Sequence, residues 1–223
     1  MIKAVIFDMY ETLISHYRCP LYFSFEMSRD AGIKVEDFLP LWKQTEVDRW
    51  IGKYTFEETI EMIMRENHCF SQEKLDLISE KRMATKVEVF ENLHEDLLSM
   101  LDCLKEKGIQ IGLISNCFSE EVIAIRNSVL APYFDCLCLS YELGVRKPED
   151  QIYLYCMDAL NVRPEECLYV GDGGCQELET ALRLGLHPLQ AAWYFQDGLE
   201  FQSKRNPEFT QLEHPFDVLK FLY

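Results

Sequence analysis

Hydrophobic residues along the chain form short runs separated by segments of mixed polarity. The run Ala4–Phe7 is too short for a helix core and is rich in β-branched and aromatic residues, as buried parallel strands are. Later runs of the same kind are expected to form strands at Ile109–Ile114, Phe134–Leu139, Cys167–Val170, His187–Ala191 and Phe209–Gln211. Because single helices separate these strands, the pattern predicts an α/β fold with a doubly wound parallel sheet.

The long stretch between the first two strands carries apolar residues three and four positions apart, as amphipathic helices do. Helices are expected there at Phe23–Asp30, Val35–Arg49, Thr55–Glu66 and Ser71–Lys81. We therefore predict a Rossmann-like core made of residues 1–16 and 87–223, and an inserted all-helical domain of residues 17–86.

The same helical spacing returns between the later strands. The helices of the core are expected at Asn92–Glu106, Glu120–Val129, Glu149–Leu160, Gln176–Leu184 and Phe216–Leu222. The polar segment Gln196–Pro207 is the one stretch that we interpret as loose.

The composition limits the classes of partner. The chain has 223 residues, with 22 Lys and Arg against 38 Asp and Glu, and its net charge of -16 argues against a nucleic-acid partner. No apolar run approaches the ~20 residues of a membrane span, and the first strand follows Met1 almost directly. We expect a cytoplasmic protein with no membrane partner.

The nine cysteines favour a reduced protein, because their number is odd and most lie in apolar segments. Cys136 and Cys138 would lie on one face of a strand and could bind a soft metal. Since no second pair and no nearby histidine completes four ligands, core packing is the favoured interpretation.

Polar residues follow the predicted strands at four places. They are Asp8 and Tyr10, then Ser115 and Asn116, then Lys147 beyond the third strand, and Asp172 with its flanking glycines. Lys147 is expected at the start of a helix, with Pro148 at an entry position. Because the carboxyl ends of parallel strands share one edge of the sheet, these residues are expected to form one site.

Each side chain has a chemical use at such a site. Asp8 can attack phosphorus or carbon and form a covalent intermediate. A second carboxylate at Asp172 would repel Asp8 unless a hard divalent cation, with Mg²⁺ as the expected ion, lay between them. Ser115, Asn116 and Lys147 can donate hydrogen bonds and positive charge to phosphate oxygens. Singly, these residues fit a helix cap, a solvated lysine and a glycine turn equally well; together they favour a site.

Four motifs in this order resemble those of the haloacid dehalogenase-like (HAD) hydrolase superfamily over nearly the whole chain. They are Asp8-Met9-Tyr10-Glu11-Thr12-Leu13, Leu113-Ile114-Ser115-Asn116, Gly144-Val145-Arg146-Lys147-Pro148 and Tyr169-Val170-Gly171-Asp172-Gly173-Gly174. The predicted helical insertion stands where the superfamily's first subgroup carries its cap domain. Most relatives with that cap are phosphatases, the phosphoglycolate phosphatases among them.

The resemblance implies a role for each matching residue. Asp8 would be the nucleophile, and Lys147 would stabilise Asp8 and the transferring group. Ser115 would bind a phosphate oxygen, with Asn116 beside it. Asp172 would hold Mg²⁺ together with Asp8 and the main-chain carbonyl of residue 10.

Three further residues near the motifs are candidates. Glu177 is expected to bind the metal or its water shell, although a glutamate favoured by the helix dipole accounts for it equally well. Thr12 is a candidate for substrate binding and Tyr10 for catalysis.

Two departures from the phosphatase pattern both concern Tyr10. Phosphatases of the superfamily have a second Asp, the general acid and base, where this chain has Tyr10. Loss of this second Asp typically lowers the rate by ~10² to 10⁴ unless Tyr10, Glu11 or a cap residue takes over its role. The 2-haloacid dehalogenases, which need no metal, have Tyr at this place. They carry Ser-Ser-Asn in the fourth motif, however, and an arginine early in the cap, where this chain has Leu41-Trp42-Lys43-Gln44 and its nearest arginine is Arg49.

The favoured hypothesis is a metal-dependent phosphatase acting on a small anionic phosphorylated substrate, as a monomer or homodimer. A carbon-halogen hydrolase is the nearest enzymatic alternative. A regulatory protein that binds Mg²⁺ and phosphate with little turnover is the alternative from another class.

Overall fold

Six strands in the described part of the chain lie parallel in one sheet of the order β3-β2-β1-β4-β5-β6. The computed structural model describes residues 1–196, 198–199 and 202–223. Its strands are β1 (Ala4–Phe7), β2 (Gln110–Ser115), β3 (Cys136–Leu139), β4 (Cys167–Gly171), β5 (His187–Ala191) and β6 (Thr210–Leu212). The doubly wound parallel sheet predicted from the sequence is confirmed.

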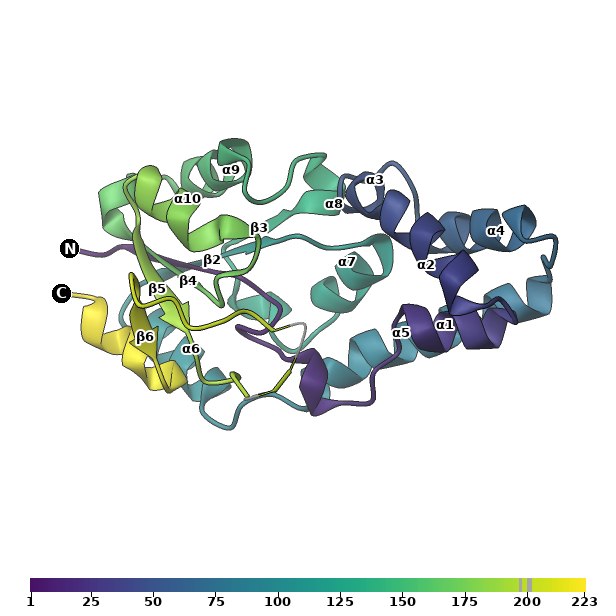
Figure 1. Ribbon diagram of the computed structural model, residues 1–223. Helices are drawn as coiled ribbons and strands as arrows, with labels where there is room; N and C mark the ends of the chain where they lie inside the picture. The colour runs from purple at the N-terminus through teal and green to yellow at the C-terminus, as the bar shows by residue number, and fades with distance from the viewer. Residues whose placement is uncertain (197, 200–201) are drawn as a thin grey trace.

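Helices cover both faces of this sheet (Figure 1). They are α6 (Leu97–Glu106), α7 (Ser119–Arg126), α8 (Ser140–Leu143), α9 (Asp150–Leu160), α10 (Glu177–Arg183) and the 3-10 helix Pro215–Phe221. Within β1, Val5 and Phe7 pack in the cluster that contains α6 and α7, whereas Ala4 and Ile6 pack against α9 and α10. Because both faces are buried, the strand sequences are continuous apolar runs.

Five α-helices lie between β1 and α6, and we refer to them as the helical domain. They are α1 (Ser24–Ala31), α2 (Val35–Gln44), α3 (Glu46–Trp50), α4 (Phe56–Glu66) and α5 (Gln72–Glu88). They enclose a hydrophobic cluster of their own, with Met27, Phe38 and Ile60 at its centre. Figure 1 shows them beyond the sheet, at the end opposite both termini of the chain.

The expected helix Val35–Arg49 is interrupted in the structure, because α2 ends at Gln44 and α3 begins at Glu46. The hydroxyl of Thr45 bonds the carbonyls of Leu41 and Trp42, an alternative to the helical pattern that often bends helices.

Helix α5 continues to Glu88, beyond the predicted end at Lys81. In its last turns, Arg82 and Lys86 form buried ion pairs with Glu121 of α7, and these pairs attach the helical domain to the core. These residues are charged and do not continue the hydrophobic pattern, so the sequence predicted the end of this helix too early.

The ends of the core helices also differ from the prediction. The expected helix Asn92–Glu106 begins only at Leu97, and the C-terminal segment is a 3-10 helix. Among the described residues, none of the helices combines the length and the apolar character that crossing a membrane requires.

Candidate active site

Three buried carboxylates meet at the carboxyl ends of β1 and β4. Asp8 follows β1, Asp172 follows the adjacent β4, and Glu177 begins α10. One oxygen of each carboxylate lies within 4.8 Å of the others. They line a cleft of about 340 Å³ between the sheet and the helical domain. The expectation that Asp8, Asp172 and Glu177 share one site agrees with this geometry.

The ammonium of Lys147 lies among these carboxylates. It donates to Asp8 and, at 2.6 Å, to Glu177. Burial alone would lower the pKa of Lys147, but the attraction of both carboxylates raises it well above its ordinary value. Lys147 lies in the loop before α9, whose first residue is Asp150, so the expected place within the helix start is corrected to one outside it.

The side chain of Asn116 fixes the backbone of Lys147. Its amide oxygen accepts from the Lys147 N–H at 2.7 Å, and its amide nitrogen donates to the Lys147 carbonyl at 3.0 Å. Asn116 also lines the cleft. Ser115 is fully buried, and among the described residues its hydroxyl makes one long 3.5 Å contact, with the Asn116 carbonyl. The second motif therefore joins the third motif to the site.

The carboxylate of Glu177 is engaged by three donors. Besides Lys147, the hydroxyl of Tyr169 donates to it at 2.8 Å and the Gly173 N–H at 3.0 Å. A Cβ on Gly171 would lie 2.1 Å from a Glu177 oxygen, so only glycine leaves room for this carboxylate. The position of Glu177 is thus fixed, and its carboxylate in turn holds the Lys147 ammonium in place.

The concentration of negative charge is visible in the acid-base properties of the site. Burial, opposed by Lys147, raises the pKa of Asp8 to about 7. Burial and the repulsion of Glu177 and Asp8 raise the pKa of Asp172 to about 8. The nearby positive charge is therefore too small to stabilise the ionised forms of Asp8 and Asp172 fully.

The turn after β1 determines what the first motif can do. Glu11 has a positive φ of 56°, and its carboxylate accepts from the Ser15 hydroxyl at 2.7 Å and the His16 N–H at 2.9 Å. These bonds hold the turn closed. The Thr12 hydroxyl is fully buried and donates to Asp8 at 3.2 Å, so it orients Asp8 and is covered from the cleft.

Tyr10 lines the cleft, but its side chain is held by the helical domain and the turn. Its ring stacks on that of His16, and the Lys86 ammonium lies 5.2 Å from its centroid. Its hydroxyl is buried and has no hydrogen-bond partner in the described part of the chain. Burial and the nearby Glu121 raise the pKa of Tyr10 well above its ordinary value, so it remains protonated.

Several cleft residues were not foreseen from the sequence. They are His16, Tyr17, Phe23, Cys175 and Ser203. Phe23 comes from the helical domain, where helical spacing made aromatic residues equally suited to a core. Trp50 of the same domain also lines the cleft, a place that the sequence allowed beside the more expected one in the core. Cys175 directly follows the fourth motif, and this position was the available signal.

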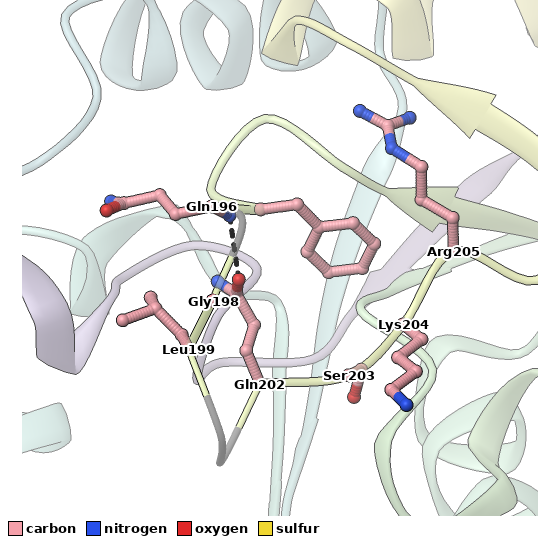
Figure 2. Close-up of a pocket in the computed structure, with 8 residues that line it drawn as sticks. Gln196, Gly198, Leu199, Gln202, Ser203, Lys204 and Arg205 are labelled. Atoms are coloured by element: carbon pink, nitrogen blue, oxygen red, sulfur yellow. Dashed lines mark hydrogen bonds between the residues drawn. The ribbon is translucent and has the colours of Figure 1, made fainter.

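The segment interpreted as loose contributes to the site. A neighbouring pocket has a volume of about 560 Å³. In this pocket Gln202 accepts from the Gln196 N–H at 2.8 Å (Figure 2). Gln202 also donates to the Tyr194 carbonyl at 2.7 Å, and Ser203 lines the active-site cleft. Residues 197, 200 and 201 of this segment lie outside the described residues.

Curated proteins with similar sequences include both phosphatases and dehalogenases. Rhythmically expressed gene 2 protein of Drosophila melanogaster is 28% identical over 87% of this chain and 74% of its own length. Phosphoglycolate phosphatase of Aquifex aeolicus is 24% identical over 99% and 96%. (S)-2-haloacid dehalogenase 1 of a Pseudomonas species is 26% identical over 76% and 75%.

Solved structures show the same fold. A HAD phosphatase from Thermococcus onnurineus matches with a TM-score of 0.70 and 18% identity, over 99% of this chain and 98% of that one. A HAD family enzyme from Bacteroides thetaiotaomicron, solved in complex with magnesium and inorganic phosphate, matches with a TM-score of 0.64 and 18% identity over 90% and 98%.

The motifs at the ends of β1, β2 and β4 all lie within the part of the sequence that matches a family model. That model describes a haloacid dehalogenase-like hydrolase and covers residues 2–185. The chain belongs to the haloacid dehalogenase-like hydrolase family and is a hydrolase.

Proposed function

We propose that the protein is a Mg²⁺-dependent phosphatase that hydrolyses a small phosphorylated metabolite through an aspartyl-phosphate on Asp8. The observation that carries the proposal is the convergence of Asp8, Asp172 and Glu177 on one another, with the Lys147 ammonium paired to Asp8 and Glu177. Three buried carboxylates and one ammonium have a formal excess of two negative charges. Such an excess is costly unless a cation compensates it.

The donor atoms at this site suit a hard divalent ion. Asp8 and Asp172 offer carboxylate oxygens, the ligand type that Mg²⁺ prefers, and the main-chain carbonyl of Tyr10 would be a third ligand. When bound, Mg²⁺ supplies positive charge that keeps Asp8 ionised and offsets charge on the phosphoryl oxygens. Glu177 is already occupied by three donors, so we assign it to the positioning of Lys147 rather than to the metal.

The residues of the site support a reaction in two steps. An Asp8 oxygen forms a bond to phosphorus while the bond from phosphorus to the leaving oxygen breaks. Water then attacks the phosphorus, which releases phosphate and restores Asp8. Thr12 orients the Asp8 carboxylate, and Lys147 neutralises charge beside it.

The leaving group receives little help from acid catalysis. Tyr10 is held in its stack with a strongly raised pKa, and the Glu11 carboxylate is engaged in closing the turn. We therefore infer a preference for substrates with good leaving groups, such as acyl or aryl phosphates. The 340 Å³ cleft suits a small metabolite.

Carbon-halogen hydrolysis is the second candidate, favoured by Tyr10 and by the similarity to a haloacid dehalogenase. Two observations weigh against it. Asp172 adds a carboxylate that metal-free chemistry does not need. The guanidinium carbon of Arg49 lies 3.4 Å from the centroid of the Trp42 ring, and Arg49 donates to the Trp42 carbonyl at 2.8 Å. This arginine is therefore already engaged in packing.

The test is phosphate release from a panel that includes para-nitrophenyl phosphate and acetyl phosphate, with Mg²⁺ and with EDTA. We expect Mg²⁺-dependent release that Asp8→Asn abolishes. Halide release from 2-haloacids in EDTA would support the dehalogenase instead. Stabilisation by Mg²⁺ and phosphate without any product would support the regulatory protein.

A further inference from the structure

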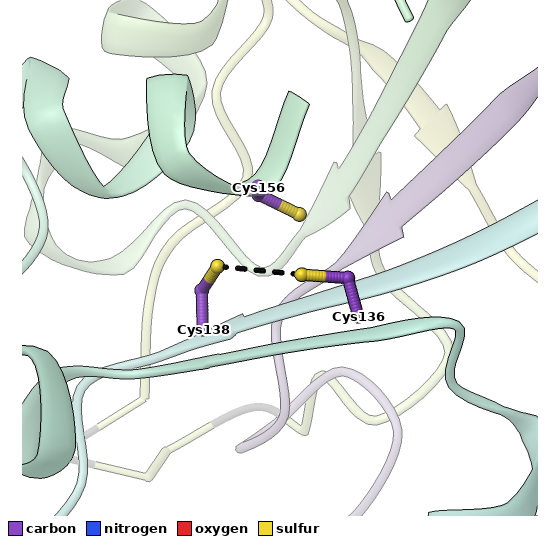
Figure 3. Close-up of side chains that lie close together, drawn as sticks. All are labelled: Cys136, Cys138 and Cys156. Carbon is purple, nitrogen blue, oxygen red and sulfur yellow. Dashed lines mark hydrogen bonds between the residues drawn. The ribbon is translucent and has the colours of Figure 1, made fainter. Parts of the chain in front are cut away.

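Three cysteines converge at the edge of the sheet away from the active site. Cys136 and Cys138 point to the same face of β3, with their sulfurs 3.7 Å apart, and Cys156 reaches them from α9. Figure 3 shows the three side chains directed toward one another. All three sulfurs lie within 4.8 Å of one another. Cys156 lies 18 residues further along the chain than Cys138, and the sequence pattern did not predict that its sulfur joins this pair.

The backbone beside the cluster is shaped to admit Cys156. Gly112 of β2 is the register partner of Cys136. A Cβ on Gly112 would lie 2.8 Å from the Cys156 sulfur, closer than real Cβ atoms approach. The missing side chain thus lets α9 bring its thiol down onto the sheet.

We propose that Cys136, Cys138 and Cys156 form a binding site for a thiophilic divalent cation of the Zn²⁺ class. Tetrahedral coordination with Zn–S bonds of ≈ 2.3 Å requires sulfurs about 3.8 Å apart. The pair on β3 already has this spacing. Cys138 and Cys156 are buried and Cys136 is half-buried, so the fourth ligand comes from solvent on the Cys136 side.

Charge supports a divalent ion at this place. Each thiol that coordinates gives its proton to solvent, so three thiolates and one divalent cation carry a single net negative charge. Cys136 is half-buried, so this single charge lies beside solvent.

A disulfide within the strand fits this geometry less well. Residues two apart in a strand have Cα atoms about 6.6 Å apart, close to the upper limit of ≈ 6.8 Å for a disulfide. A metal needs only that the sulfurs converge, which all three do.

The test is titration of the reduced, metal-free protein with Cd²⁺, a Zn²⁺ analogue with thiolate charge-transfer absorption, and with Zn²⁺ against a chromophoric chelator. We expect the thiolate absorption to report one Cd²⁺ bound to the cysteine cluster per chain, and at least a tenfold weaker affinity for this ion in Cys156→Ala. Gly112→Ala should also weaken binding although all three thiols remain. Cys167→Ala, which removes a buried thiol outside the cluster, and Cys175→Ala, which removes an exposed one, should leave the affinity unchanged.

A measurement on the wild-type protein avoids any effect of a substitution on folding. Zn²⁺ should slow alkylation of Cys136 by a maleimide while Cys175 still reacts. The proposal is overturned if Cys136 reacts equally fast at every Zn²⁺ concentration, or if Cys156→Ala binds Cd²⁺ as tightly as the wild type. Loss of the absorption in Cys175→Ala would also overturn it.

Discussion

The rings of Tyr10 and His16 stack face to face, with centroids 4.5 Å apart and planes inclined by 15°. Through this stack Tyr10, two places after Asp8, forms part of the junction between the core and the helical domain. The Lys86 ammonium, 5.2 Å from the Tyr10 ring centroid, borders the same junction. A side chain so held is not placed to exchange protons with a leaving group.

The first prediction concerns this residue. Tyr10→Phe keeps the stack and removes the hydroxyl, so we expect kcat on para-nitrophenyl phosphate to change by less than about threefold. Tyr10→Asp introduces a carboxyl that can act as acid and base, and should raise kcat on alkyl phosphates by about tenfold or more. Steady-state kinetics on an aryl and an alkyl phosphate measure both. A large loss in Tyr10→Phe would show that the hydroxyl is catalytic.

Mg²⁺ should stabilise the folded protein through Asp172. We expect the Tm of the wild type to rise with Mg²⁺ concentration, because an ion that binds only the folded state shifts the folding equilibrium. Asp172→Asn removes a ligand and should lose most of this rise. Asp158→Asn makes the same chemical change at an exposed position of α9 and serves as the control. A Mg²⁺-dependent rise that survives in Asp172→Asn would place the ion elsewhere.

Glu177 gives a prediction that separates positioning from metal binding. Glu177→Gln weakens the hold on Lys147, and we expect kcat to fall by roughly 10- to 100-fold, as for residues that orient active groups. The Mg²⁺ concentration for half-maximal activity should change little. Titration of activity with Mg²⁺ measures both quantities. If the Mg²⁺ requirement rises tenfold or more, Glu177 is a metal ligand after all.

The ion pairs between the helical domain and the core predict how stability depends on pH. Burial alone would raise the pKa of Glu121, but Lys86 and Arg82 lower it below 4.5. Because the folded-state pKa is depressed, the stabilisation is complete above the unfolded pKa of about 4.5 and is lost as the pH falls through the folded value.

Glu121→Gln should accordingly cost about 3 kcal/mol at pH 7, since it leaves Lys86 without its partner in a buried place. Its difference from the wild type should shrink below pH ~4.5. Urea unfolding at several pH values measures this. Glu142→Gln, which breaks the exposed pair with Arg126, should cost less than about 1 kcal/mol. A difference that stays constant down to pH 3 would contradict the assignment.

The sequence predicted the sheet because its strands are buried on both faces, and apolar runs such as Ala4–Phe7 have few other interpretations. It predicted the place of Asp8, Lys147 and Asp172 because parallel strands end at one edge. The sequence pattern did not predict contacts between distant segments of the chain. The bond from Asn116 to Lys147 joins residues 31 apart, and neither residue type indicates the other.

Charged residues at element ends were the other source of error. Arg82 and Lys86 extend α5 past its hydrophobic pattern, since their buried partners lie on α7. Glu177 was ambiguous as a helix-start residue, and only the structure brings Tyr169 and Gly173 to its carboxylate.

The central claim is that Asp8 carries the phosphoryl group, and trapping this intermediate tests it most directly. The protein with Mg²⁺ and acetyl phosphate would be quenched within a single turnover, reduced with borohydride to convert an acyl phosphate into homoserine, and mapped by mass spectrometry. We predict conversion at Asp8 in the wild type and none in Asp8→Asn. Release of phosphate without any modification at Asp8 would contradict the account.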